Sequence, residues 1–139
     1  MAEPATQLFD WDAIRIGDAL PSYEYVLTQE MVDKYRQSVE DPHARFPTIA
    51  VKEDVASFYQ KYHHDVGSVN ARCAFYCYNP PVPGTRLRVN AWIADKYMRR
   101  EKPYIVVEAV SVDDSGRLID RVITHDLKRP SEVGKKWGR

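Results

Sequence analysis

The spacing of hydrophobic residues divides the chain into a short strand, two helices and a run of longer strands. Aromatic and branched residues are concentrated in Tyr23–Leu27, which favours a strand there. Thr28, a good N-cap, then begins a helix with an apolar face, and Asp41-Pro42 ends it because a residue before proline resists the helical conformation. A second helix is predicted from about Ile49 to His63, where apolar residues recur at helical spacing: Val51, Val55, Phe58, Tyr59 and Tyr62.

The remainder of the chain has the pattern of strands. We expect them at Ala71–Tyr78, Thr85–Tyr97, Tyr104–Val112 and Leu118 to about Leu127. Between them lie a rigid proline-rich turn and a hairpin turn in which Gly116 provides a positive φ. One strand, two helices and four antiparallel strands predict an α+β fold, in which a curved sheet wraps around a long helix and the last three strands form a meander.

The length of 139 residues and a hydrophobic content of 44% fit one globular domain that spans residues 1–139. Within it we expect residues 1–8 to be an N-terminal arm, with Phe9 and Trp11 as anchors at its end. The basic tail, residues 128–139, is expected to be mobile.

Charge and composition exclude several classes of protein. Twenty basic and twenty acidic residues cancel, which argues against a non-specific nucleic-acid binder. The absence of a long apolar run predicts no membrane span, and the first residues lack the pattern of a secretory signal, so a cytoplasmic location is expected. Cys73 and Cys77 are too few for a disulfide scaffold and are expected as thiols in a core strand, and no cluster has the spacing of a zinc site.

Several segments, taken in order, resemble a known family. Phe9–Asp18, with its aromatic residue, isoleucine and Gly-Asp pair, resembles the opening of the MaoC-like hydratases and dehydratases. The helix from Thr28 to Asp41, the turn within Tyr76–Leu87, and the hairpins at Tyr97–Tyr104 and Asp114–Gly116 resemble later parts of the same family. The resemblance covers the chain from Phe9 to Lys128 and implies a hotdog fold, in which a curved antiparallel sheet wraps around a long central helix.

The resemblance also implies a chemistry. Members of the family mostly add water to, or remove it from, acyl thioesters carried on coenzyme A or an acyl carrier protein, and an enoyl-CoA hydratase or dehydratase is therefore the expected activity. They usually assemble as dimers with the pantetheine arm near the subunit interface. For this chain we therefore expect an acyl-thioester ligand, a homodimer or a hetero-oligomer with another hotdog chain, and neither cofactor nor metal.

The family's acid/base motif is altered in this chain. Its usual form is Gly-Asp, one residue, Asn-Pro, one residue, His, whereas this sequence has Glu40 in place of the glycine, followed by Asp41, Pro42 and His43. Counted without gaps, Phe46 falls on the histidine position; counted with a deletion, the segment is a contracted version of the motif. The resemblance then makes Asp41 and His43 the acid/base pair.

Substrate-binding groups are also implied by the resemblance. Backbone N–H groups near Ile49, Ala50 and Val51, at the start of the long helix, would hold the thioester oxygen. Tyr76 and Tyr78 point to one side of their strand, where they either line an acyl tunnel or fill the core.

The altered motif leaves two other functions open. The chain can be the non-catalytic subunit of a two-subunit hydratase, in which it shapes the pocket and the partner carries the catalytic residues. It can also be a hotdog acyl-CoA thioesterase, which uses a carboxylate on the central helix to activate water; Glu53 or Asp54 would serve in this role.

Overall fold

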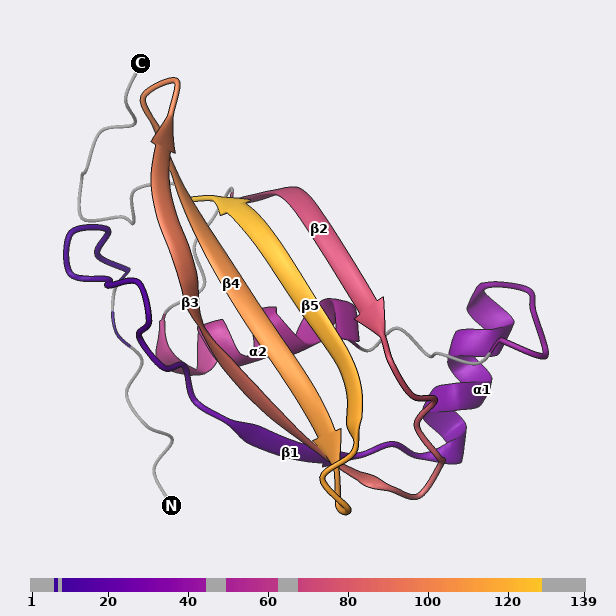
Figure 1. The fold of residues 1–139 in the computed structure, drawn as a ribbon. Helices are drawn as coiled ribbons and strands as arrows, with labels where there is room; N and C mark the ends of the chain where they lie inside the picture. Colours follow the sequence, from indigo (N-terminus) through magenta and orange to yellow (C-terminus); the bar gives the residue numbers. More distant parts are fainter. Residues whose placement is uncertain (1–6, 8, 45–49, 63–67, 129–139) are drawn as a thin grey trace.

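The computed structural model describes residues 7, 9–44, 50–62 and 68–128. These residues form a five-stranded antiparallel sheet with one helix lying across a face and a second helix beyond its end (Figure 1). The elements in chain order are β1 Tyr23–Val26, α1 Gln29–Ser38, α2 Ala50–Lys61, β2 Val69–Cys77, β3 Arg86–Arg99, β4 Lys102–Asp113 and β5 Leu118–Leu127. The predicted α+β order of elements is therefore confirmed.

The order of the strands in the sheet is β1-β3-β4-β5-β2. The meander of the last three strands is confirmed, and the two earlier strands lie on its two edges. Helix α2 packs mainly against β3, β4 and β5, and the edge strand β2 is not among the strands that it contacts most. As a result, nearly every side chain of β2 is exposed, on both faces of the sheet.

Strand ends differ from the predicted ends by a few residues. The largest change is at the hairpin between β3 and β4, where Arg99 pairs with Lys102 and only Arg100 and Glu101 form the turn. Both have left-handed backbone, with φ of 50° and 61°. The sequence predicts a turn around Arg99–Lys102, and its position is confirmed. A two-residue turn of this kind matches the twist of paired strands but usually contains glycine or asparagine, so the sequence gives no signal for its type.

Helix α1 begins where its sequence predicts. The Thr28 side chain accepts a hydrogen bond from the backbone N–H of Met31 at 3.2 Å, which confirms Thr28 as the N-cap. Its apolar side packs through Val32 onto Leu27, Leu87 and Ile119, a small core separate from the one under α2. The resulting position, past the end of the sheet, places the loop that follows α1 at one end of the molecule (Figure 1).

The main core lies between α2 and the sheet. Phe58 of α2 and Tyr62, directly after the helix, are buried there with Phe9, which confirms Phe9 as an anchor of the N-terminal segment. The predicted apolar face of α2 is partly wrong, since Val55 is 36% exposed while Glu53, Asp54 and Ser57 are 0–1% exposed. The first half of the helix thus presents polar groups to the sheet.

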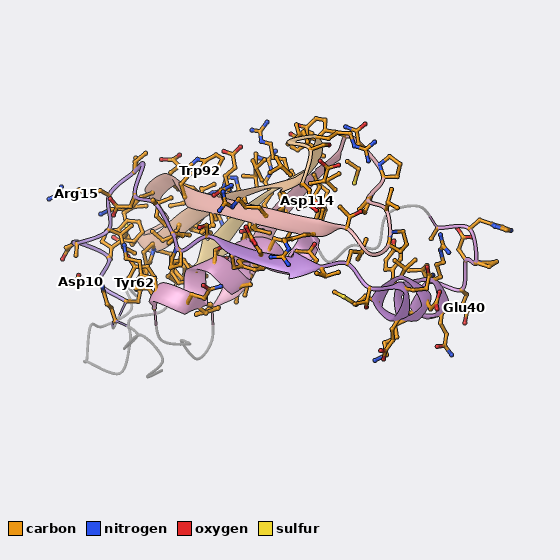
Figure 2. All side chains as sticks on the ribbon, turned by 90° about the horizontal axis from the view of Figure 1, so that it is seen from below. Asp10, Arg15, Glu40, Tyr62, Trp92 and Asp114 are labelled. Carbon is orange, nitrogen blue, oxygen red and sulfur yellow. The ribbon has the colours of Figure 1, made fainter. Side chains whose placement is uncertain are left out.

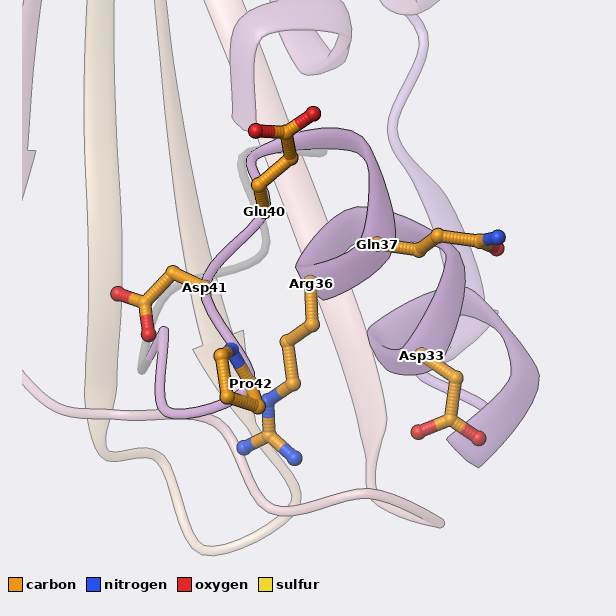
Figure 3. Close-up of a pocket in the computed structure, with 6 residues that line it drawn as sticks. All are labelled: Asp33, Arg36, Gln37, Glu40, Asp41 and Pro42. Carbon is orange, nitrogen blue, oxygen red and sulfur yellow. The ribbon is translucent and has the colours of Figure 1, made fainter.

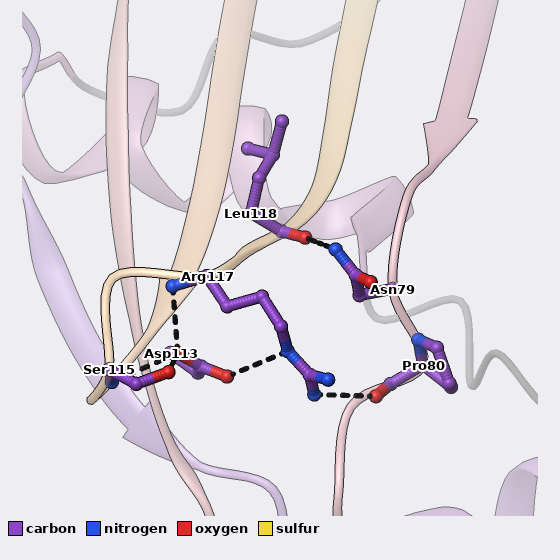
Figure 4. Close-up of polar contacts among 6 residues, drawn as sticks. All are labelled: Asn79, Pro80, Asp113, Ser115, Arg117 and Leu118. Carbon is purple, nitrogen blue, oxygen red and sulfur yellow. Dashed lines mark hydrogen bonds and ion pairs between the residues drawn. The ribbon is translucent and has the colours of Figure 1, made fainter.

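Two turns at one end of the sheet are joined by polar contacts (Figure 4). In the β4–β5 turn, Asp113 accepts hydrogen bonds from the backbone N–H groups of Ser115 and Arg117, and Gly116 has the predicted positive φ of 79°. Asn79 donates to the carbonyl of Leu118 at 2.7 Å, and Arg117 donates to that of Pro80 at 3.3 Å. These bonds lock the C-terminal side of β2 to the hairpin.

Two local predictions differ from the structure. Cys73 and Cys77 are exposed on the inner face of β2 rather than buried, because α2 packs mainly over the other strands of the sheet. Lys128, the first residue of the predicted mobile tail, is 1% exposed, because its ammonium group lies 4.2 Å from the ring centroid of Phe58 on α2. The rest of that tail and most of the predicted arm lie outside the described residues.

Candidate active site

The predicted acid/base pair lies in the loop after α1. Asp41 and His43 are both exposed, and the Asp41 carboxylate accepts a 2.9 Å hydrogen bond from the backbone N–H of His43. The loop folds back on the helix, because the Arg36 side chain donates to the carbonyl of Ala44 at 3.1 Å. The structure therefore brings Asp41 and His43 together through a backbone hydrogen bond, in a loop open to solvent.

A hollow of about 450 Å³ adjoins this loop (Figure 3). Its lining is polar and comes from the end of α1 and the loop: Asp33, Arg36, Gln37, Glu40, Asp41 and Pro42. Figure 2 shows the labelled Glu40 beside α1, in the turn that follows it, at the opposite end of the molecule from Asp10 and Tyr62. The hollow is shallow and open to solvent, so within one chain it does not enclose an acyl chain.

The backbone at Glu40 has a conformation that glycine usually adopts. Glu40 has φ of 55°, in the left-handed region that glycine adopts without steric cost. The backbone N–H of Glu40 donates to the Gln37 carbonyl, and the backbone N–H of Asp41 donates to the Arg36 carbonyl. Hydrogen bonds of this kind end a helix. The loop thus keeps the turn that a glycine would favour, although the glycine itself is replaced.

The predicted substrate-binding residues fall in different places. Ala50 and Val51 form the first turn of α2, as predicted, while Ile49 lies outside the described residues. Tyr76 and Tyr78 are 44% and 45% exposed and stack on each other, and the Arg121 guanidinium lies 5.2 Å from the Tyr76 ring centroid. Because side chains alternate along a strand, they are on the face away from α2, outside the space between helix and sheet.

A buried pair of carboxyl groups occupies that space instead. Glu53 of α2 lies beside Asp120 of β5, and Tyr25 of β1 donates to Glu53 Oε1 at 2.8 Å, while Glu53 Oε2 accepts no hydrogen bond from the described residues. On the other side, Ser111 of β4 donates to Asp120 Oδ1 at 2.8 Å. Three strands and the central helix are therefore joined by one polar chain within the core.

Two adjacent carboxyl groups in a dry site cannot both be ionised. Burial, followed by the adjacent carboxyl of Asp120, raises the pKa of Glu53 to about 9. Burial and the same acidic neighbours also raise the pKa of the Tyr25 hydroxyl. With its pKa raised in this way, the Glu53 carboxyl keeps its proton at neutral pH.

Asp54 lies at a second polar position on α2. Its Oδ2 accepts a short hydrogen bond from Thr124 of β5, whereas its Oδ1 has no hydrogen-bond partner among the described residues. Burial raises the pKa of the Asp54 carboxyl, an effect opposed by the Thr124 hydrogen bond, by backbone N–H groups and by the charge of Lys128. The two carboxyls at the start of α2 thus face different surroundings.

Sequence reasoning identified Glu53 and Asp54 only as carboxylates of the central helix and did not find their partners. Asp120 and Thr124 alternate with Val122 on the inner face of β5, so a polar residue recurs where a core strand would be apolar. This break in the alternation is the one signal that could have placed them. Among the described residues, no group of three His, Cys, Asp or Glu side chains is arranged to hold a metal ion.

The architecture is the hotdog fold of the MaoC-like dehydratases, with the central helix across a curved antiparallel sheet. The HadBC 3R-hydroxyacyl-ACP dehydratase complex of Mycobacterium tuberculosis has a chain that superposes with a TM-score of 0.65 at 18% identity, over 81% of this chain and 96% of that chain. A MaoC-like dehydratase from Rhodospirillum rubrum gives 0.61 at 12%, over 86% and 97%. The R-hydratase PhaJ1 of Pseudomonas aeruginosa gives 0.61 at 9%, over 94% and 95%.

At sequence identities this low, the structural similarity to these proteins establishes the fold alone. No protein-family model and no curated protein sequence matches the chain. Within the described ranges, neither helix has the length and apolar character needed to cross a bilayer.

Proposed function

We propose that this chain acts on acyl thioesters as a hydratase or dehydratase, adding water reversibly to a 2-enoyl thioester of coenzyme A or of an acyl carrier protein. The observation that carries the proposal is the fold, which this chain shares over most of its length with a 3R-hydroxyacyl-ACP dehydratase and an R-hydratase. A cytoplasmic location and no cofactor are part of the same proposal.

In the proposed reaction, Asp41 and His43 hold one water molecule. One of the two groups removes a proton from the water. The oxygen of the water then bonds to C3 of the enoyl chain, and the electron pair of the double bond moves toward the thioester carbonyl. The other group then delivers a proton to C2, so one water is consumed and no bond to sulfur breaks. Backbone N–H groups in the first turn of α2, at Ala50 and Val51, would stabilise the negative charge on the carbonyl oxygen.

Loss of either acid/base group is expected to reduce hydration of crotonyl-CoA and longer 2-enoyl-CoAs strongly. Removing one general acid or base from a positioned pair lowers kcat by about 10²–10⁴-fold. The measurement is the loss of enoyl absorbance with the pure protein and its Asp41→Ala and His43→Ala variants. Asp33→Ala, on the same hollow but outside the pair, is the matched control and should retain activity.

Equal rates in the two variants and the native chain would remove Asp41 and His43 from the mechanism. Because both residues are exposed on a surface loop, their replacement should leave the free energy of unfolding almost unchanged. Thermal unfolding of each variant therefore separates a catalytic loss from a loss of fold.

A second function, that of a non-catalytic subunit that completes a partner's pocket, is favoured by a specific observation. Asp41 and His43 are open to solvent, and the Asp41 carboxylate is already used by the backbone of its own loop. The edge strand β2 also pairs on one side only among the described strands, so a second hotdog chain, identical or different, could cover its free edge. The HadBC neighbour is itself a complex.

Hydration by the chain alone distinguishes the two functions. If this is a pocket-forming subunit, we expect no hydration by the purified chain, recovery of a second hotdog chain in a pull-down identified by peptide sequencing, and activity only when both are present. Size-exclusion chromatography with light scattering reports the assembly. Full activity of a single-component sample would contradict the subunit function.

The thioesterase alternative depends on Asp54 rather than Glu53. A protonated Glu53 has no negative charge with which to take a proton from water, because burial and Asp120 hold its pKa near 9. Thioester hydrolysis releases a free thiol whereas hydration releases none. Thiol titration during turnover of a saturated acyl-CoA therefore separates the two reactions.

A further inference from the structure

Arg36 lies in the last turn of α1, next to the loop that contains the proposed acid/base pair. Its half-buried side chain leaves the helix toward the part of the loop that contains Pro42 (Figure 3). The Arg36 Nε donates to the backbone carbonyl of Ala44 at 3.1 Å. Ala44 is eight residues further along the chain and outside the helix, so this bond does not serve to cap a carbonyl of α1. It joins the helix to the far end of the loop.

The main chain of Arg36 bonds the other end of the same loop. The backbone N–H of Asp41 donates to the Arg36 carbonyl at 3.1 Å. Residues 41–44 therefore begin and end on hydrogen bonds to one helical residue, the first to its main chain and the second from its side chain. A segment bonded at both ends has fewer conformations than a segment bonded at one end. Because the guanidinium is charged, its bond is stronger than one between neutral groups.

Hydrogen bonds inside the loop carry this restraint to the two proposed catalytic residues. The backbone N–H of His43 donates to Asp41 Oδ1 at 2.9 Å, and that of Ala44 donates to the Asp41 carbonyl at 3.3 Å. Pro42, between the two residues, has a fixed φ. The orientation of the Asp41 carboxylate thus depends on the backbone of His43, which leads directly into the Ala44 carbonyl that Arg36 holds.

Packing provides little restraint on this loop. Asp41, Pro42 and His43 are exposed, and neither apolar cluster of the described residues includes them. Glu40, directly before them, has the left-handed φ of 55°, which is unfavourable for a residue with a side chain. Exposed segments with few apolar contacts open readily, so their order depends on polar contacts such as those of Arg36.

We propose that Arg36 is a positioning residue for the hydration reaction: it holds residues 41–44 in the arrangement that presents the Asp41 carboxylate and the His43 imidazole to one water molecule. Arg36 acts through the two loop ends that it bonds and not through the substrate. The inference rests on the proposed function, because it concerns the same acid/base pair. A catalytic group displaced by about 1 Å loses about 100-fold in rate, so loss of this restraint should lower kcat rather than raise KM.

Backbone order parameters from nuclear magnetic resonance test the restraint without reference to activity. In the native chain, the N–H groups of His43 and Ala44 should have values near about 0.85, as in rigid backbone, and in Arg36→Ala they should fall below about 0.6. Arg36→Lys keeps a charged donor and should give intermediate values. Gln37→Ala, which removes a neighbouring exposed side chain on the same hollow, is the matched control and should keep the native values.

Hydration of crotonyl-CoA by the same variants tests the consequence for catalysis. Arg36→Ala should lower kcat by about 10- to 100-fold and change KM by less than about twofold, and Arg36→Lys should recover part of the rate. The double variant Arg36→Ala/His43→Ala should be no slower than His43→Ala, because Arg36 acts through the pair. A purely structural contribution would instead lower the rate in both backgrounds.

Unchanged order parameters in Arg36→Ala, a native kcat in that variant, or additive losses in the double variant would each overturn the inference and leave the proposed function intact. A native chain that has no hydration activity, but whose ordered loop loses its order in Arg36→Ala, would overturn the proposed function and leave Arg36 as the residue that holds the loop. If Arg36→Ala does not fold, the order parameters and kcat of Arg36→Lys decide, and native values of both would overturn the inference.

Discussion

Glu53→Gln is expected to make the protein more stable at pH 8 than the native chain, by about 2–4 kcal/mol, and to make stability nearly independent of pH around Glu53. Glutamine has the shape of the protonated acid, so its oxygen accepts from Tyr25, as Glu53 does. The difference is that glutamine cannot lose a proton inside the core. Chemical denaturation of both proteins at several pH values measures the effect.

The sign follows from the direction of the pKa shift. The pKa of Glu53 is about 9 in the folded chain and about 4.5 in the unfolded chain, so the folded chain holds the proton over that interval. Above pH 4.5, the unfolded chain gains stability by releasing it, and the free energy of unfolding falls until the folded chain also releases it near pH 9. The pKa of Asp54 is raised as well, so some pH dependence remains in the variant.

An exposed carboxylate provides the control. Glu30 lies on the surface of α1 in an ion pair with Lys34, and Glu30→Gln should leave the pH profile of stability unchanged. At pH 4, where Glu53 is protonated in both states, native chain and Glu53→Gln should be about equally stable. If the stability of the native chain does not fall between pH 5 and 8 relative to that of Glu53→Gln, Glu53 is ionised in the folded core, because neither state then releases its proton over that interval.

The second large effect is expected at Phe58. Its side chain is 2% exposed and contacts the rings of Phe9, Tyr59 and Tyr62 as well as the Lys128 ammonium. Phe58→Ala leaves a cavity at the centre of the helix–sheet interface and should lower the free energy of unfolding by about 3–5 kcal/mol. Urea denaturation monitored by tryptophan fluorescence gives the value directly.

Phe75 offers a comparison with the same change of side chain. It is 39% exposed on the inner face of β2, which is not among the strands that α2 contacts most. Phe75→Ala should therefore lower the unfolding free energy of the isolated chain by less than about 1 kcal/mol. If a second hotdog chain covers β2, the same variant should instead weaken the assembly at low protein concentration. Equal losses in the two variants would mean that α2 is not the centre of the core.

Local patterns were sufficient to predict much of the fold. The N-cap at Thr28 and the glycine turn at Gly116 depend on a few neighbouring residues, and both are confirmed. The position of the β3–β4 turn, around Arg99–Lys102, follows from the sequence, whereas its type does not, because Arg100 and Glu101 adopt left-handed backbone only when the paired strands impose it. The burial of Lys128 could not be predicted, because it depends on the rings of α2, which are distant in the sequence.

The polar residues between α2 and the sheet were harder to predict, because their burial also depends on residues that are distant in the sequence. Helical spacing placed Val55 on the apolar face of α2, whereas Glu53 and Ser57 are the residues that face the sheet. An apolar pattern cannot show this, because burial of Glu53 is possible only where Asp120, Tyr25 and Ser111 satisfy it. The roles proposed for Asp41, His43 and the start of α2 come from the family resemblance, and they remain predictions.

The strand order has a consequence for how the chain acquires its structure. β2 is synthesised directly after α2, yet its neighbour in the sheet is β5, whose last residue is Leu127. During translation, some fifty residues must therefore be synthesised after β2 before the strand that pairs with it is complete. In contrast, β3, β4 and β5 can pair as successive hairpins. Docking of β2 should be a late, slow kinetic phase, and a ribosome-bound chain stopped before β5 should expose it to chaperones.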